Sequence, residues 1–156
     1  MSMSSSNPLE DWHFLIGEWQ GQSKDPESEE GIIETSDVYT LELSGVYIMG
    51  RHKAVKDGNI VHEAFSLMYY DKRNKKLRRK SAYSYGFVNN EVEFERTNDV
   101  VRFDIEMEPS PQAFDGTRWK SYIKKISETE IREGLEVAKG EEDFTIYADN
   151  VSKKVK

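Results

Sequence analysis

Short runs of β-branched and aromatic residues, separated by turn signals, repeat along most of this chain of 156 residues. Nearly every connection is short enough for an antiparallel hairpin, and Asp57-Gly58-Asn59 is a strong hairpin signal because these residues readily adopt positive φ. A sheet of so many strands with one dry face usually closes on itself, which removes its exposed edges. We therefore predict an all-β fold, a closed antiparallel up-and-down barrel of about ten strands; a two-sheet sandwich is the alternative. The expected strands begin at Glu18 and continue over 32–43, 46–55, 60–70, 77–85, 91–97, 100–106, 117–126, 130–138 and 143–147, with a tight turn at Asn89-Asn90.

The segment 10–21 is an apolar cluster that holds two of the chain's three tryptophans. Trp12, Leu15, Ile16 and Trp19 are spaced as one face of a short helix. Gly17 interrupts this face and favours a stop. We therefore predict a short helix over 8–16 that plugs one end of the barrel and leads into the first strand.

The composition predicts one folded domain. Hydrophobic residues make up 37% of the chain and charged residues 33%, but aromatic residues reach 12%, more than a disordered chain carries. We expect a disordered segment over 1–7, a single barrel domain over 8–150 and a polar tail over 151–156. An acidic loop at 24–31 and a long loop at 109–116 interrupt the strand series.

Charge and residue usage exclude several classes of function. The net charge of −7 opposes binding to nucleic acid and to anionic lipids. The basic run Lys72–Lys80 contains no aromatic side chain, so we interpret it as a solvated hairpin loop and adjoining strand. The absence of cysteine excludes thiolate chemistry, and no apolar run has the length of a membrane span. We expect a cytoplasmic protein that binds neither nucleic acid nor membranes.

The interior of such a barrel is the place to look for a ligand. The residues predicted to reach it are mostly aromatic and include three possible polar contacts: Trp19, Tyr47, Met49, His52, Arg79, Tyr83, Phe94, Phe103 and Trp119. On the strand with His52, the inner face is either Ile48, Gly50 and Ala54 or Tyr47, Met49 and Val55. Arg79 and Tyr83 share a face with Ser81 and Tyr85 and form a carboxylate clamp if that face is internal.

Histidine chemistry has weaker signals. His62 lies on the less apolar face of its strand, so an outward position is favoured. His13, beside Trp12, is expected to have a structural role. No His-x-His or His-x-x-x-His pair occurs, so no metal site is predicted. The chain also lacks a Gly-x-Ser-x-Gly elbow and a phosphate-binding glycine loop, and no catalytic residue is assigned.

The run Leu15-Ile16-Gly17-Glu18-Trp19-Gln20-Gly21 resembles the Leu-x-Gly-x-Trp-x-Gly pattern of the calycin barrels. Within them it is most similar to nitrobindins and to lipocalin-like or fatty-acid-binding-protein-like domains of unknown function. The likeness extends to Gly45–Gly50 and to Met68–Asp71. It implies a ten-stranded barrel and, for nitrobindins, haem bound through a histidine on a strand near the C-terminus. The histidines here are His13, His52 and His62, so haem is not carried over and no cofactor is predicted.

Three hypotheses for function remain. The first is a barrel that binds a small, mostly apolar molecule, with or without a carboxylate, and the protein is then not an enzyme. The second is an enzyme that uses a Tyr or His acid–base group and Arg79 as anchor, for which polar groups must converge in the interior. The third is a filled barrel that acts in protein–protein contact. A homodimer is compatible with each.

Overall fold

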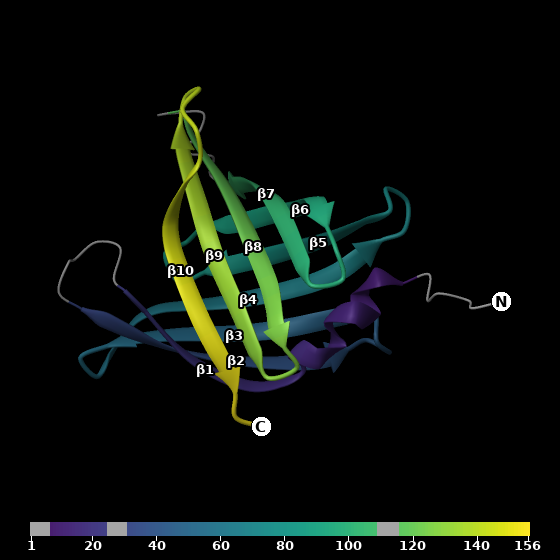
Figure 1. Ribbon diagram of the computed structural model, residues 1–156, viewed down its shortest axis with the longest axis horizontal. Helices are drawn as coiled ribbons and strands as arrows, with labels where there is room; N and C mark the ends of the chain where they lie inside the picture. Colours follow the sequence, from purple (N-terminus) through teal and green to yellow (C-terminus); the bar gives the residue numbers. More distant parts are fainter. Residues whose placement is uncertain (1–6, 25–30, 109–115) are drawn as a thin grey trace.

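The computed structural model describes residues 7–24, 31–108 and 116–156. Within these ranges one short helix and ten antiparallel strands form a closed barrel (Figure 1). Each strand pairs with its neighbour along the chain, and β10 pairs with β1 to close the ring. The predicted up-and-down barrel is therefore confirmed. The elements are η1 Pro8–Leu15, β1 Gly17–Lys24, β2 Ile32–Glu42, β3 Tyr47–Lys56, β4 Asn59–Asp71, β5 Lys76–Tyr83, β6 Val88–Arg96, β7 Val100–Glu108, β8 Thr117–Ser127, β9 Glu130–Lys139 and β10 Thr145–Lys154.

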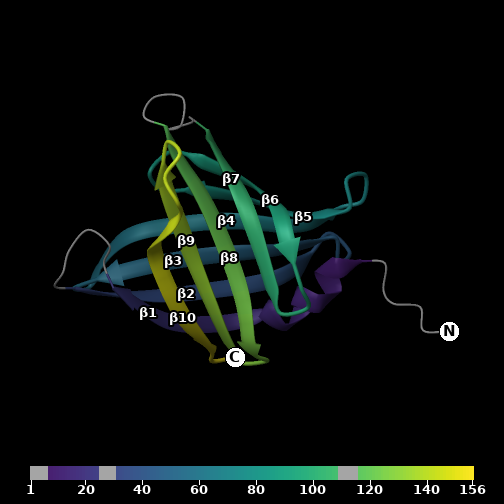
Figure 2. The same ribbon diagram turned by 45° about the horizontal axis from the view of Figure 1, so that its top comes forward.

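The helix η1 is a 3₁₀ helix that lies across one end of the barrel (Figures 1 and 2). Asn7 caps it by accepting a hydrogen bond from the backbone N–H of Leu9 at 3.0 Å. Trp12 and Leu15 are fully buried, and the indole N–H of Trp19 donates to the carbonyl of Leu15 at 2.7 Å. The N-terminal segment is thus both a cap and a part of the core.

Gly17 makes the sharp passage from η1 into β1 possible. Its φ is +135°, which residues with a side chain rarely adopt, and a Cβ at this position would collide with the carbonyl oxygen of Lys156. The backbone N–H of Glu18 donates to that same oxygen at 2.9 Å. A backbone hydrogen bond therefore joins the start of β1 to the last described residue of the chain at this point.

The inner face of the barrel follows from the strand registers. Residues directly opposite each other in paired strands point to the same face of the sheet. One buried residue therefore shows that the residues opposite it on the neighbouring strands also point into the barrel. The apolar core lies at the η1 end, where the inward side chains pack against the helix. Its strand members are Trp19, Tyr39, Ile48, Met68, Leu77, Val101, Phe103, Ile123 and Ile131.

Two segments differ from the sequence prediction. β10 continues to Lys154, so residues 151–154 are not a polar tail; Ser152 is fully buried opposite Gly21. Asn89 and Asn90 lie inside β6 rather than in a turn, because Asn89 is an internal residue with side-chain partners. The segment 1–7, apart from Asn7, and most of the loops predicted at 24–31 and 109–116 lie outside the described residues.

Candidate functional site

Charged and polar side chains converge on the inner face between the two ends of the barrel. We call this group the central polar cluster: Asp37, Tyr39, His52, Arg79, Glu91 and Glu133. The registers explain its pairs, since Asp37 lies directly opposite His52, and Arg79 directly opposite Glu91. Each pair joins two neighbouring strands, so the sheet itself brings their side chains together.

The ion pair between Arg79 and Glu91 is the most heavily bonded part of the cluster. Nε and Nη2 of Arg79 each donate to a different Glu91 oxygen at 2.8 Å, and the hydroxyls of Ser81 and Ser121 donate to the same carboxylate at 3.0 and 2.6 Å. Burial alone would lower the pKa of Arg79, but the Glu91 carboxylate reverses this effect and raises it. The guanidinium is therefore already occupied by a carboxylate of the protein.

Tyr39 and Glu133 meet across the interior from strands that are not neighbours. The Tyr39 hydroxyl donates to Oε1 of Glu133 at 3.3 Å, and the nearest guanidinium nitrogen of Arg79 lies 3.9 Å from that oxygen. Burial and the nearby charge of Asp37 raise the pKa of Glu133. Burial, followed by Glu133, raises the pKa of Tyr39 well above its ordinary value. Glu133 is thus a buried carboxyl group whose charge is only partly compensated.

Asp37 and His52 form a second acid–base pair. Nδ1 of His52 donates to Oδ1 of Asp37 at 2.7 Å, which leaves Nε2 as the ring nitrogen for other partners. Burial would lower the pKa of His52, but the hydrogen bond and charge of Asp37 raise it above the ordinary value. Such a pair can hold or transfer a proton near neutral pH.

A series of rings extends from this pair toward the end of the barrel opposite η1. The ring of His62 lies 5.4 Å from that of His52 and 5.2 Å from that of Tyr83, measured between centroids. Burial and then His52 lower the pKa of His62 to about 4, so this ring is neutral at pH 7. The side-chain amide of Asn89 donates to the Tyr83 hydroxyl at 3.2 Å.

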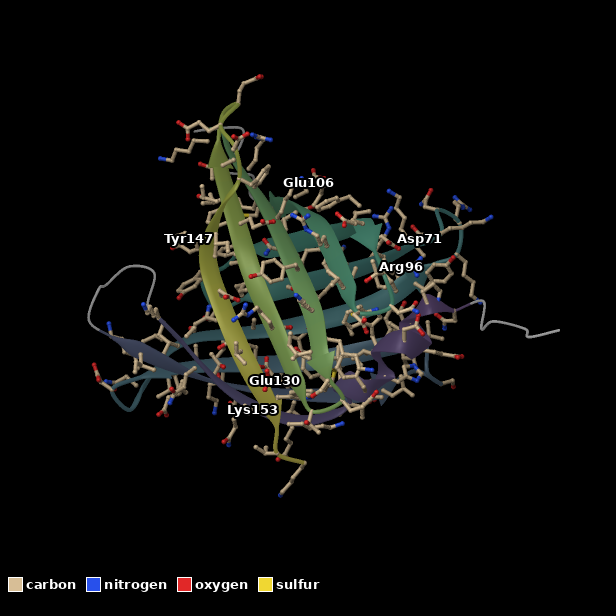
Figure 3. The ribbon with its side chains drawn as sticks, viewed as in Figure 1. Asp71, Arg96, Glu106, Glu130, Tyr147 and Lys153 are labelled. Atoms are coloured by element: carbon tan, nitrogen blue, oxygen red, sulfur yellow. The ribbon has the colours of Figure 1, made fainter. Side chains whose placement is uncertain are left out.

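Aromatic residues also lie on the opposite wall at this end. Trp119 on β8 and Tyr147 on β10 meet edge to face, with ring centroids 5.2 Å apart. Figure 3 shows Tyr147 far from η1, whereas Arg96 lies near the helix. His62, Trp119 and Tyr147 are only half-buried although the inward residues at the η1 end are fully buried. Solvent therefore reaches the inner face from the end opposite η1.

The structure places some of the predicted interior residues inside and others outside. Trp19, His52, Arg79, Tyr83, Phe103 and Trp119 lie on the inner face; their contact with a ligand stays a prediction. Tyr47, Met49 and Phe94 lie on the outer face, so their predicted interior position was wrong.

The outer residues have partners of their own. Tyr47 packs against Tyr69 of the next strand, with centroids 5.6 Å apart. Phe94 lies beneath the cations of Arg102 and Lys120 at 5.1 and 4.2 Å. These contacts let large side chains remain on the wet face of the sheet.

The sequence interpretation missed several members of the cluster and reversed one. His62, predicted to point outward, lies on the inner face opposite Ala54. Asp37, Glu91 and Glu133 were not singled out, because a lone carboxylate in a strand usually indicates the solvated face. The sequence did carry one signal for the inner face. Gly50 and Ala54 share a face of β3 with His52, and Ala64 shares a face of β4 with His62; such small apolar residues are not typical of a solvated outer face.

Haem as the nitrobindin resemblance implies it does not fit these residues. The inner faces of β9 and β10, the last strands, carry Glu133 and Ser152, and the chain has no histidine after position 62. The two internal histidines lie on β3 and β4, far from the strand near the C-terminus that the resemblance implies. Among the described residues, no group of three or more His, Asp or Glu side chains is arranged to hold a metal ion.

Comparison with known proteins supports the fold. No protein-family model matches the chain, and no curated protein matches it. Among solved structures, the crystal structure of Rv2717c from M. tuberculosis is similar with a TM-score of 0.72 and 16% identity, over 99% of this chain and 100% of that one. The S-type phycobiliprotein lyase CPES from Guillardia theta is similar with a TM-score of 0.61 and 9% identity, over 96% and 93% of the two chains. Both similarities support the fold of the closed barrel. In the described part of the chain, no helix is long and apolar enough to cross a membrane.

Proposed function

We propose that this protein binds a small, mostly apolar molecule on the inner face of its barrel, at the end opposite η1. The observation that supports the proposal is the meeting of two environments there. Aromatic rings on opposite walls, among them His62, Tyr83 and Trp119, provide an apolar contact surface. The central polar cluster beneath them provides hydrogen bonds that fix orientation, as in most small-molecule sites.

We propose that the ligand differs from the haem of the nitrobindins, which the N-terminal pattern resembles. The interior histidines lie on β3 and β4 and not on a strand near the C-terminus, so we propose a ligand that is not haem. A ligand carboxylate is not part of the proposal, because Nε and Nη2 of Arg79 already donate to Glu91 and its Nη1 faces the carboxyl group of Glu133. A cytoplasmic location and a homodimer stay predictions.

Native mass spectrometry of protein purified from its own host tests the proposal directly. We expect a discrete small molecule to accompany the folded protein and to leave on denaturation. Addition of that molecule should quench Trp119, whereas Trp12 and Trp19 lie in the plugged end and should respond little. A Trp119→Phe variant that keeps binding but loses the quenching would locate the ligand. A Soret band after haem addition would contradict the exclusion of haem.

Acid–base catalysis is the second candidate, and the pair between Asp37 and His52 favours it. A histidine oriented by a buried carboxylate can take a proton from a ligand through Nε2. Incubation of the protein and its ligand in D₂O, followed by NMR, should then show deuterium at a carbon of the ligand. The exchange should disappear in His52→Gln while binding persists. If the wild-type protein binds the ligand but shows no exchange, the result would contradict acid–base catalysis and support binding alone.

A further inference from the structure

Two buried acceptor atoms on the inner face have no hydrogen-bond donor among the described residues. They are Oδ2 of Asp37 and Oδ1 of Asn89. Asp37 is only 3% exposed and Asn89 only 2%. A buried acceptor without a partner loses its hydrogen bonds to water without replacing them, so native structures rarely leave one unfilled. Both atoms therefore indicate donors that the protein itself does not supply.

The two acceptors lie at the two ends of one series of rings. Asp37 holds His52 through its other oxygen, and Asn89 holds the Tyr83 hydroxyl through its amide nitrogen. The ring of His62 lies between His52 and Tyr83 and contacts both. A molecule lying along these rings would meet an acceptor at each end and π faces between them.

The charges of the surrounding side chains indicate the sign of such a molecule. At the η1 end, Glu93 is paired with Arg96 at 3.0 Å, and the ammonium of Lys154 donates to the carbonyl of Phe14. In the central polar cluster, Arg79 is paired with Glu91. Among the described inner-face residues, the carboxyl groups that remain are Asp37, which His52 contacts through one oxygen only, and Glu133, whose nearest guanidinium nitrogen on Arg79 is 3.9 Å away. A ligand cation would compensate the free oxygen of Asp37, whereas an anion would face both carboxyl groups.

We infer that the molecule bound in this barrel is an organic cation with N–H donors on an apolar or aromatic frame, such as a primary amine, an amidine or a protonated nitrogen heterocycle. Oδ2 of Asp37 accepts its charged N–H group, and Oδ1 of Asn89 accepts a second donor. The rings of His62 and Tyr83 contact the frame between them, where a cation is also attracted by π faces. This assignment rests on the proposed function and replaces the ligand carboxylate that Arg79 alone had indicated.

Three probes that share one frame and differ only in charge test this assignment. Naphthylmethylamine, naphthalenemethanol and naphthoate are titrated into the wild-type protein at pH 7 by isothermal titration calorimetry. We expect the amine to bind at least about tenfold more tightly than the alcohol, and naphthoate to bind least. Equal binding of the three probes, or tighter binding of naphthoate, would overturn the assignment and leave the proposed function intact. Failure of all three to bind would count against both.

Variants locate the amine. Asp37→Asn keeps the shape of the side chain but removes its charge, so the affinity for the amine should fall about tenfold or more while that for the alcohol changes little. Asn89→Ala should change the affinity for these two probes little, because neither carries the second donor that Oδ1 of Asn89 would accept. Asp104→Asn, an exposed carboxylate on the outer face opposite Lys120, is the matched control and should change neither. An amine that binds Asp37→Asn as tightly as wild type would show that Oδ2 of Asp37 is filled by water instead.

Discussion

The buried ion pair between Arg79 and Glu91 should be the polar contact on which the stability of this barrel depends most. Glu91 is 2% exposed and accepts hydrogen bonds from Arg79, Ser81 and Ser121. Glu91→Gln has nearly the same shape but cannot accept from all these donors, and it leaves the guanidinium without its counter-ion. Breaking a buried pair from one side costs about 3–5 kcal/mol. For a chain of this size, that corresponds to a loss of roughly 6–20 °C in Tm.

Urea unfolding followed by tryptophan fluorescence measures this cost. The midpoint should fall while the m-value stays constant, because the surface exposed on unfolding is unchanged. Glu95→Gln is the control: its pair with Arg102 lies on the outer face and should contribute less than about 1 kcal/mol. The double variant Arg79→Met with Glu91→Leu should recover most of the lost stability, since it removes both charges. A loss below about 1 kcal/mol in Glu91→Gln would refute the reasoning, because water or another group would then have replaced the carboxylate.

Further predictions concern titration and packing. In NMR titrations, the pKa of His62 should be about 4 and that of His52 should lie above its ordinary value of 6.5. Asp37→Asn should lower the pKa of His52. It should raise the pKa of His62, because His52 then carries less positive charge. Because unfolded histidine takes up its proton first, His62 should make the free energy of unfolding fall as the pH decreases from about 6.5 to about 4. His52 acts in the opposite sense: its contribution is present below about pH 6.5 and is lost as the pH rises through its folded pKa. Gly17→Ala should cost at least about 2 kcal/mol in urea unfolding, more than Gly58→Ala, whose positive φ faces open space. Leu15→Ala, at the fully buried last residue of η1, should cost about 2–5 kcal/mol, and a smaller effect would show that the helix is loosely packed.

The architecture could be predicted because local signals determine it. Asp57 and Gly58 both adopt positive φ at the turn between β3 and β4, as their residue types indicate. The apolar segment 10–21 predicted a short helix over 8–16 that covers one end, and η1 occupies Pro8–Leu15, although Ile16 follows the helix and Trp19 lies in β1. Such signals depend only on neighbours along the chain, so a sequence carries them in full.

The inner face was harder to predict because it depends on partners distant in sequence. Glu91 and Glu93 alternate with Val92 and Phe94, so polarity alone assigns the carboxylates to solvent. Glu91 lies inside because Arg79 on β5 pairs with it, and nothing within β6 indicates that partner; Glu93 pairs with Arg96 at the end of the same strand. On β3 the same difficulty placed Tyr47 and Met49 inside together with His52, although odd- and even-numbered positions of one regular strand lie on opposite faces.

The pairing of β1 with β10 makes the order of synthesis matter for this protein. The last strand of this barrel to leave the ribosome supplies the partner of the first, so β1 and β9 keep unpaired edges until β10 has been made. The contact between Tyr39 and Glu133, 94 positions apart in the chain, can form only late in folding. A nascent chain stalled before β10 should therefore present two open strand edges and an unfinished interior, which makes it a substrate for chaperones and a risk for aggregation.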